Sequence, residues 1–346
     1  GQQYLDQLLN CGHPERIKGA LRMSRGTFIS LHNWLVNHTQ LRASMHVSVE
    51  LKLAIFLHIV SRPASQRDTM ERYFVGNRVV SESFHEVLDS LLILYPSFVK
   101  LPDLNTPLAS RISDDPRFYP WFKDCLGALD GTHIAAHTSL EEQPKFRNRK
   151  GFLSQNVLAV CDFDLNFVYV LPGWEGSAHD GRVLLDAQAS QGFVTPPGKY
   201  WLGDAGYGNS EYVLAPYRSV RYHLKEQRLA NLKPENAKEL FNLRHASLRN
   251  VIERIFGVIK RRFKILAVMG EYSIQTQIQL VLGLLGLFNF IRQREGVELN
   301  DDISDNAGDL TPLVAATRSQ SQGSKAMNDF RDKVAQEMWV AYCQHI

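Results

Sequence analysis

The sequence predicts a mixed α/β protein whose first third is all-helical. Two observations predict this. The first 110 residues carry apolar residues at helical spacing, and from residue 125 short apolar runs typical of strands alternate with helical ones. A chain of 346 residues has the length of about two domains at roughly 150 residues each. Its 39 basic and 36 acidic residues and 44% hydrophobic content are ordinary, which excludes collagen-like and wholly disordered chains.

The N-terminal region, residues 1–110, has the outline of a helix-turn-helix domain. We expect an apolar helix over residues 51–60 and a short helix over Arg67–Phe74 that stops at Gly76. The next helix is expected to open at Ser83, because Glu86 stands at capping-box spacing from it. The alternative is a plain three-helix packing unit, which the scarcity of basic residues in this region favours.

A second domain is expected over residues 111–292, after a polar stretch at 112–120. Strands are predicted over 125–135 with an end near Asp130, and over 155–161, 166–172 and 199–204. Helices are predicted over 180–189 and 234–264. The connection at 161–165 is typical of a hairpin, so the first part of the sheet should be antiparallel.

The remaining chain predicts a flexible linker and a final helix. Residues 293–325 are acidic and then rich in Ser, Gln and Gly, and residues 326–346 form an amphipathic helix. The most apolar stretch, 280–291, has 12 residues and is too short to span a bilayer, so we expect no membrane association. The four cysteines form no CxxC pair, which speaks against a disulfide framework or a cysteine zinc site and suits the cytosol or nucleus.

Four acidic residues stand at the edges of predicted elements. Asp130 and Asp204 end strands, Asp180 begins a helix, and Glu253 is the one acid among seven basic residues from 244 to 264. Poorly hydrated carboxylates that repel one another ionise together only around a cation, and hard oxygen ligands suit Mg²⁺ or Mn²⁺. Two such ions can activate an attacking oxygen and stabilise a leaving oxygen at phosphorus.

Three of these acids also have a simpler interpretation. Asp130 and Asp204 are turn formers in Gly-rich surroundings, and Glu253 forms an ion pair with Arg249 or Arg254 on a solvated helix face. A second basic run at 145–150 and the basic helix would hold a polyanion against the acids, although a solvated charged face is the alternative for each run.

Five motifs follow one another between about residues 120 and 268. They occupy residues 129–134 (LDGTHI), 147–157 (RNRKG and SQNV), 173–180 (GWEGSAHD), 202–218 (LGDAGY and APYR) and 241–263, which includes IER at 252–254. In this order they make the chain resemble PIF/Harbinger-type DDE transposases, a group that includes domesticated Harbinger-derived nucleases. The N-terminal helices resemble the family's helix-turn-helix region with less motif support.

The resemblance implies an RNase H-like catalytic core, a mixed sheet flanked by helices, behind the N-terminal all-α, helix-turn-helix-like domain. It implies a catalytic triad of Asp130, Asp204 and Glu253 that holds two Mg²⁺ or Mn²⁺ ions, with Asp180 as a further metal ligand. Asp180 is the alternative second member of the triad; Asp204 is preferred because a strand end is held more rigidly. His133 and His179 are expected to support these acids rather than to react. The predicted DNA-binding residues are Lys145, Arg147, Arg149, Lys150, Arg249, Arg254, Lys260, Arg261 and Arg262.

The implied function is a metal-dependent transposase or endonuclease. It would hydrolyse a phosphodiester at a transposon end and join the resulting 3′-OH to target DNA. Its expected partners are double-stranded DNA, a Myb/SANT-like protein that recognises the ends, and further copies of itself. Its expected location is the nucleus, reached by import together with that partner, and the cytoplasm otherwise. Two alternatives stand beside it: a domesticated DNA- or chromatin-binding protein that no longer cuts, and a two-carboxylate glycosidase, which the surrounding basic residues disfavour.

Overall fold

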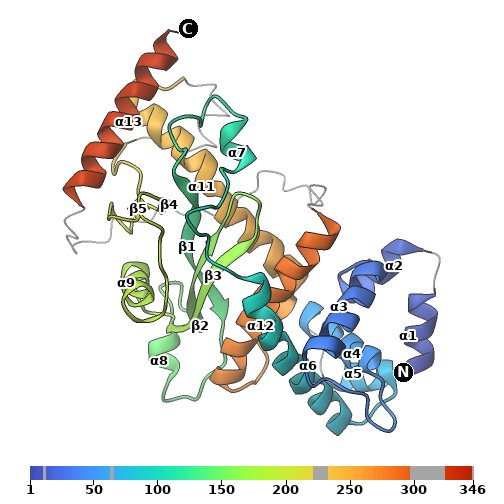
Figure 1. Cartoon of the computed structure of the whole chain (residues 1–346). Helices are drawn as coiled ribbons and strands as arrows, with labels where there is room; N and C mark the ends of the chain where they lie inside the picture. The colour runs from blue at the N-terminus through green and yellow to red at the C-terminus, as the bar shows by residue number, and fades with distance from the viewer. Residues whose placement is uncertain (11–12, 63–65, 221–232, 297–323, 345–346) are drawn as a thin grey trace.

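The computed structural model describes residues 1–10, 13–62, 66–220, 233–296 and 324–344. A mixed sheet with helices around it forms one half of the molecule, and a cluster of N-terminal helices forms the other half (Figure 1). The mixed α/β class predicted from the sequence is therefore confirmed. The predicted linker lies almost wholly outside the described residues, which stop at residue 296 and resume at residue 324.

The sheet has five strands in the order β3-β2-β1-β4-β5. Their bounds are β1 Cys125–Ala135, β2 Ser154–Cys161, β3 Phe167–Glu175, β4 Tyr200–Leu202 and β5 Val213–Leu214. The pairs β1–β2 and β2–β3 are antiparallel, whereas β1–β4 and β4–β5 are parallel. An antiparallel meander followed by parallel strands on its far side is consistent with an RNase H-like core.

Strand β1 does not end near Asp130 as the sequence suggested. It pairs with β2 continuously from Ala128 opposite Cys161 to Ala135 opposite Ser154, so Asp130 stands in the middle of the strand. The prediction was wrong because Asp-Gly favours a turn only locally, whereas eight consecutive pairings to a fully buried β2 hold the backbone extended.

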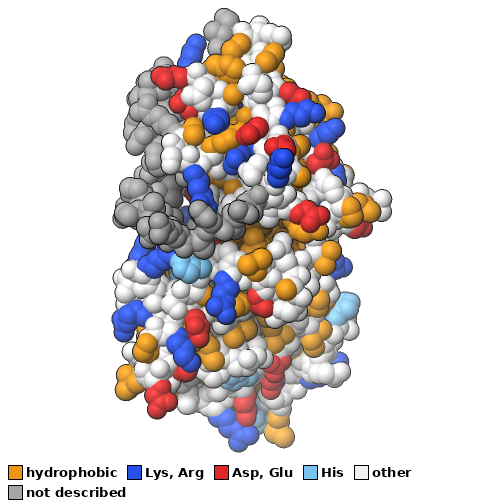
Figure 2. Space-filling view, turned by 90° about the vertical axis from the view of Figure 1, so that its left-hand side faces the viewer, with side chains coloured by type: hydrophobic (Ala, Val, Ile, Leu, Met, Phe, Trp, Pro, Cys, Tyr) orange, Lys and Arg blue, Asp and Glu red, His pale blue; other side chains and the backbone are white. Residues whose placement is uncertain are grey.

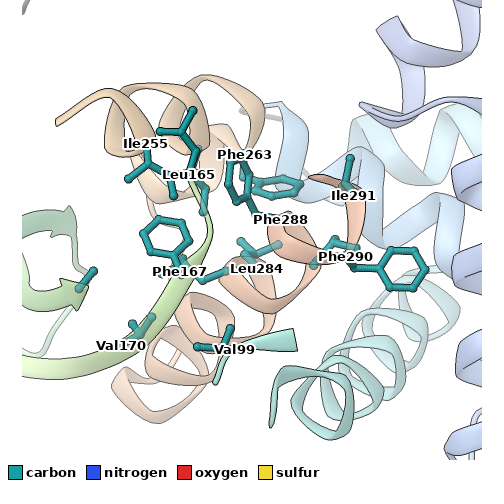
Figure 3. Packing of buried hydrophobic residues seen from close by; sticks show 14 of the residues in the cluster. Val99, Leu165, Phe167, Val170, Ile255, Phe263, Leu284, Phe288, Phe290 and Ile291 are labelled. Atoms are coloured by element: carbon teal, nitrogen blue, oxygen red, sulfur yellow. The ribbon is translucent and has the colours of Figure 1, made fainter. Parts of the chain in front are cut away.

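The helices of the sheet half include α7 Ser110–Ser113, α8 Gln143–Phe146, α9 Asp180–Ser190, α11 Ala237–Arg262, α12 Ile274–Glu295 and the 3₁₀ turn Lys264–Leu266. Helix α11 packs against β1, and α12 packs against β3 on one side and α6 on the other. Phe167 of β3 meets Ile255 of α11 and Phe288 of α12 in the shared apolar core (Figure 3). Asn289 fastens this junction, because its Nδ2 donates to the carbonyls of Phe98 and Phe167.

Helix α12 is long and apolar enough to pass as a membrane span by length and composition. However, 67% of its most apolar window is buried inside the protein. We therefore treat it as the core helix that joins the two halves, in agreement with the buried helix expected over residues 280–291.

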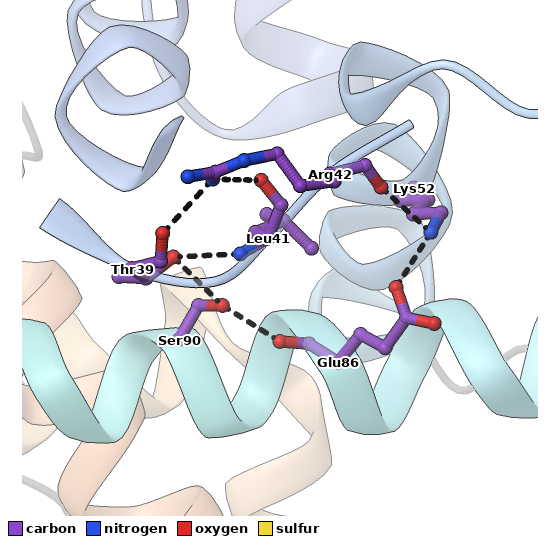
Figure 4. Close-up of polar contacts among 6 residues, drawn as sticks. All are labelled: Thr39, Leu41, Arg42, Lys52, Glu86 and Ser90. Atoms are coloured by element: carbon purple, nitrogen blue, oxygen red, sulfur yellow. Dashed lines mark hydrogen bonds and ion pairs between the residues drawn. The ribbon is translucent and has the colours of Figure 1, made fainter. Parts of the chain in front are cut away.

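The N-terminal half consists of α1 Gln2–Leu9, α2 Pro14–Leu21, α3 Arg25–His38, α4 Val49–Ser61, α5 Gln66–Tyr73 and α6 Asn77–Phe98. The capping-box prediction at Ser83 was wrong, because α6 already begins at Asn77 and Ser83 is buried inside it. Glu86 instead accepts a hydrogen bond from the Nζ of Lys52 at 2.6 Å, beside a bond from Ser90 to the Glu86 carbonyl (Figure 4). Glu86 thus forms an ion pair with Lys52, which is only 5% exposed.

The C-terminal helix α13, Lys325–Cys343, lies along α11 of its own chain (Figure 1). The hydroxyl of Tyr217 donates to Asp332 at 2.6 Å, and the Arg331 guanidinium lies 4.0 Å from the centre of the Tyr217 ring. Asn209 donates to Asn328 at 2.8 Å. Helix α13 therefore braces the segment 209–217 that follows Asp204.

Candidate active site

The four predicted acids come from four elements around the sheet, with α9 and α11 packed in different apolar clusters. Asp130 stands in β1, Asp204 lies two residues after the end of β4, Asp180 begins α9 and Glu253 lies in α11. Burial raises the pKa of Asp130 to about 7, and the charges of Asp204, Asp180 and Glu253 raise it further against the opposing effect of Arg249. The structure therefore places the other three acids close enough for their charges to act on Asp130.

Arg249 joins two of these carboxylates. One guanidinium nitrogen donates to Asp130 Oδ2 at 3.0 Å, and another donates to Glu253 Oε1 one helical turn further along α11. Burial lowers the pKa of Arg249, but the charges of Asp130, Glu253 and Asp204 outweigh that effect and raise it above its ordinary value. The ion pair between Glu253 and Arg249 considered from the sequence is thus present. It is partly buried rather than on a fully solvated face, since the Glu253 and Arg249 side chains are 26% and 17% exposed.

The carboxylate of Asp180 lies directly over the backbone of β1. A Cβ added at Gly131 would fall 2.8 Å from Asp180 Cγ and would overlap its Oδ1, so a larger residue here would force the Asp180 carboxylate or the strand to move. Asn156 of β2 donates to Asp180 Oδ1 at 2.7 Å and to the Ala178 carbonyl at 3.1 Å. The sequence alone does not assign Asn156 to the site, although this residue lies in the SQNV motif.

The carboxylate of Asp204 is held by its own loop. Its Oδ1 accepts the backbone N–H of Gly206 at 2.8 Å and that of Tyr207 at 3.3 Å. Burial raises the pKa of Tyr207 well above its usual value, and the charges of Asp130, Asp180 and Asp204 add to the effect. The Tyr207 hydroxyl has no hydrogen-bond partner among the described residues. The ring therefore stands among the acids, a position that no sequence signal indicated.

Two of the predicted basic residues border the acids. Lys260 of α11 donates from Nζ to Thr132 Oγ1 and to the His133 carbonyl, both at 2.8 Å, and burial lowers its pKa to about 8. Arg149 contacts His179, with 2.7 Å between an Arg149 guanidinium nitrogen and His179 Nδ1. His179 immediately precedes Asp180, so Arg149 reaches the start of α9.

His133 and two further basic residues, Lys145 and Arg147, bond to groups other than the four acids, although the charge of Asp180 acts on His133. His133 Nδ1 lies 3.0 Å from Ser154 Oγ, and burial lowers the pKa of His133. Lys145 pairs with Glu142 at 3.1 Å, and Arg147 donates to the Gly151 carbonyl at 2.7 Å. No contact of the Lys150 side chain with the four acids is found among the described residues. The positive charge of Lys150 helps to lower the pKa of His133.

Two of the remaining predicted basic residues of α11, Arg254 and Arg262, contact other parts of the molecule. Arg254 lines a cavity of about 220 Å³ together with Arg111, Arg292 and Ser247. Arg262 donates to the carbonyl of Arg22, while Arg261 stands exposed beside it. On the face shown in Figure 2, basic and acidic side chains are interspersed rather than gathered into one patch.

The chemistry of the donor set fits a hard divalent cation. Asp130 is buried beside one guanidinium and lies within range of the charges of three further carboxylates, and oxygen ligands of this kind suit Mg²⁺ or Mn²⁺. In the part of the chain that the structure describes, no three acidic, histidine or cysteine side chains converge closely enough to hold an ion as they stand. Arg249 accounts for this in part, because it lies between Asp130 and Glu253.

Comparisons with known proteins agree with this picture. Residues 129–289 match a family described as DDE superfamily endonuclease, a span that includes all four acids. Residues 1–93 match a domain of unknown function. The chain is 30% identical to "Putative nuclease HARBI1" of Homo sapiens over 304 residues, which is 86% of this chain and 81% of that protein. It is 24% identical to "Protein ALP1-like" of Arabidopsis thaliana over 226 residues, 60% of this chain and 52% of that protein.

These likenesses, with the sheet and its acids, define a DDE-type endonuclease domain. The chain belongs to the Harbinger-type family of DDE transposase-derived proteins. The resemblance recognised from its motifs is therefore confirmed. No solved structure matched the chain.

Proposed function

We propose that this protein is a metal-dependent DNA endonuclease of the transposase type. It would cleave phosphodiester bonds at transposon ends and join the 3′-OH ends to target DNA. The observation that carries the proposal is that Asp180, Asp204 and Glu253 lie close enough for their charges to act on a buried Asp130. We assign Asp130, Asp204 and Glu253 as the triad and Asp180 as a further metal ligand.

The chain's own residues would prepare this chemistry by holding acids and substrate in place. When bound, two Mg²⁺ or Mn²⁺ ions would activate the attacking water or 3′-hydroxyl and stabilise the departing oxygen. Gly131 and Asn156 position the Asp180 carboxylate, and the loop N–H groups of residues 206 and 207 orient Asp204. Lys260 and Arg149, which contact Thr132 and His179 close to Asp130 and Asp180 in the chain, would hold the phosphodiester strand.

The partners follow from the same proposal. Double-stranded DNA would be the substrate, and the N-terminal helices would supply further contacts as a helix-turn-helix-like domain. A Myb/SANT-like protein would recognise the terminal sequence, homo-oligomers would bring two ends together, and the protein would act in the nucleus. Tagged protein expressed with and without that partner would show whether nuclear accumulation depends on it.

A second candidate is a domesticated DNA- or chromatin-binding protein without cleavage activity. One observation favours it: the Arg249 guanidinium already pairs with both Asp130 and Glu253 and offsets part of their negative charge. Like the first candidate, this protein would bind DNA, but it would not cleave it.

The experiment that separates the two is a nicking assay on supercoiled plasmid with the full chain in Mg²⁺, Mn²⁺ or EDTA. Asp204→Ala serves as the test variant, and Glu211→Ala, an exposed acid further along the same chain segment, serves as its control. We expect metal-dependent nicking by the wild type and the control but not by Asp204→Ala. Equal nicking by Asp204→Ala would contradict the proposed site. If no protein nicks, the assay is repeated with the Myb/SANT-like partner and a terminal-repeat substrate, and absence of cleavage there would favour the non-cutting candidate.

A further inference from the structure

We infer that Arg249 is an internal counter-cation that competes with the divalent ion for Asp130 and Glu253. In the metal-free protein its guanidinium holds these two carboxylates, and it must release at least one of them before the ion can bind. Arg249 thereby sets the metal affinity of the site. The inference rests on the proposed metal-dependent function and deepens it.

The first support is the geometry of the contacts. The planar fork of Arg249 reaches Asp130 Oδ2 from β1 and Glu253 Oε1 from α11, two carboxylates that belong to different layers of the fold. A guanidinium is the side chain best suited to such two-pronged pairing with oxygens. A divalent ion would need oxygens of these same carboxylates, so the two cations draw on one set of ligands.

The second support is the burial of the three side chains. Arg249 is 17% exposed, and Asp130 and Glu253 are 20% and 26% exposed, so solvent screens their charges only in part. Two cations held between the same acids would repel each other strongly in such surroundings. Without either cation, the clustered acids would repel one another instead. The guanidinium therefore stabilises the metal-free fold and opposes metal binding by the same contacts.

Arg254 offers a matched comparison on the same helix. It stands next to Glu253 in the chain but lines the cavity with Arg111 and Arg292, on another face of α11. Removing its charge changes the net charge of the protein by the same amount as removing that of Arg249. Only Arg249, however, shares oxygens with the metal site.

The test is calorimetric titration of Mn²⁺ into the full chain as wild type, Arg249→Gln and Arg254→Gln, with thermal unfolding in EDTA and in Mn²⁺. We expect Arg249→Gln to bind Mn²⁺ at least about tenfold more tightly than the wild type, because a competing positive charge is removed. The melting temperature of Arg249→Gln in EDTA should be lower than that of the wild type, and it should rise by more than the wild-type value when Mn²⁺ is added. Arg254→Gln should bind Mn²⁺ with wild-type affinity.

Equal or weaker Mn²⁺ binding by Arg249→Gln would overturn the inference, as would an equal gain in Arg254→Gln. If Arg249→Gln does not fold in EDTA, Arg249→Lys replaces it. A lysine has one ammonium and cannot span both carboxylates, so its affinity for Mn²⁺ should still exceed that of the wild type, and wild-type affinity would overturn the inference. Absence of Mn²⁺ binding in every protein would overturn the proposed metal-dependent function and this inference together. Binding of equal strength in all of them would overturn this inference alone.

Discussion

Two faces of helix α11 carry similar charges but have different surroundings. Glu253 and Arg249 face β1 and the acids, whereas Arg254, the next residue after Glu253, lines a separate cavity. Successive residues of a helix point about 100° apart, so the side chains of Glu253 and Arg254 lie on different faces of α11. The comparison teaches that the density of charge along α11 does not define the site, whereas the face that meets β1 does.

The largest effect is expected when an acid on the β1-facing side is made neutral. Asp130→Asn and Glu253→Gln should each reduce DNA cleavage at least about 10³-fold, because metal ligands act as a unit and are not replaced by the remaining ones. Both variants remove repulsion among the acids, so their melting temperatures in EDTA should not fall as far as that of Arg249→Gln. Cleavage rates and melting curves check this; wild-type cleavage by either variant would contradict it.

A smaller but still large effect is expected at Gly131. In Gly131→Ala the new Cβ would overlap the Asp180 carboxylate, so that carboxylate or β1 must shift. Displacement of a reacting group by about 1 Å can cost on the order of 10²-fold in rate. The matched control is Gly181→Ala, one residue after Asp180, where an added Cβ meets nothing within 4 Å. Single-turnover cleavage should fall in the first variant and stay at the wild-type rate in the second.

A pH-dependent effect is expected at Lys260. Its burial disfavours the charged form and lowers its pKa to about 8, so its positive charge is complete well below pH 8 and is lost as the pH rises through that value. If Lys260 holds a DNA phosphate, DNA affinity should fall between about pH 7 and 9, by a step of about tenfold or less for one lost contact. Lys260→Arg should remove this step, because arginine stays charged over this range. Fluorescence anisotropy with labelled duplex DNA measures it, and the same step in Lys260→Arg would contradict the assignment.

The smallest effect is expected on the other face of α11. Arg254→Gln should change cleavage by no more than about twofold at physiological salt, because a charge outside the site contributes only weak, screened attraction to DNA. A loss as large as that at Gly131 would show that the cavity of Arg254 belongs to the DNA-binding surface, as the sequence alone suggested.

Much of the α/β core could be predicted because alternation and apolar runs are local signals. The strands near residues 155–172, the helix that starts at Asp180 and the long helix around Glu253 follow from them. The course of β1 through Asp130 could not be predicted, since pairing with β2 overrides the turn preference of Asp-Gly. For the same reason α6 begins before Ser83, where packing on the core outweighs a local capping pattern.

The acids of the site could be named from the sequence, but their partners could not. The bridge from Arg249 to Asp130 spans 119 positions, and the contact of Asn156 with Asp180 joins β2 to the start of α9. Both depend on the folded sheet rather than on spacing along the chain. The position of Tyr207 among the acids is likewise a product of packing. The docking of α13 on its own chain also depends on tertiary contacts to segment 209–217.

The most direct test of the central claim is to map the metal site chemically. Fe²⁺ takes the place of Mg²⁺ in the full chain, and ascorbate with peroxide then generates radicals that cut the backbone beside the bound ion. We predict fragments that end near residues 130, 180, 204 and 253, that are suppressed by excess Mg²⁺ and that disappear in Asp130→Asn. Cuts elsewhere in the chain, or cuts at these positions that persist in Asp130→Asn, would contradict the account.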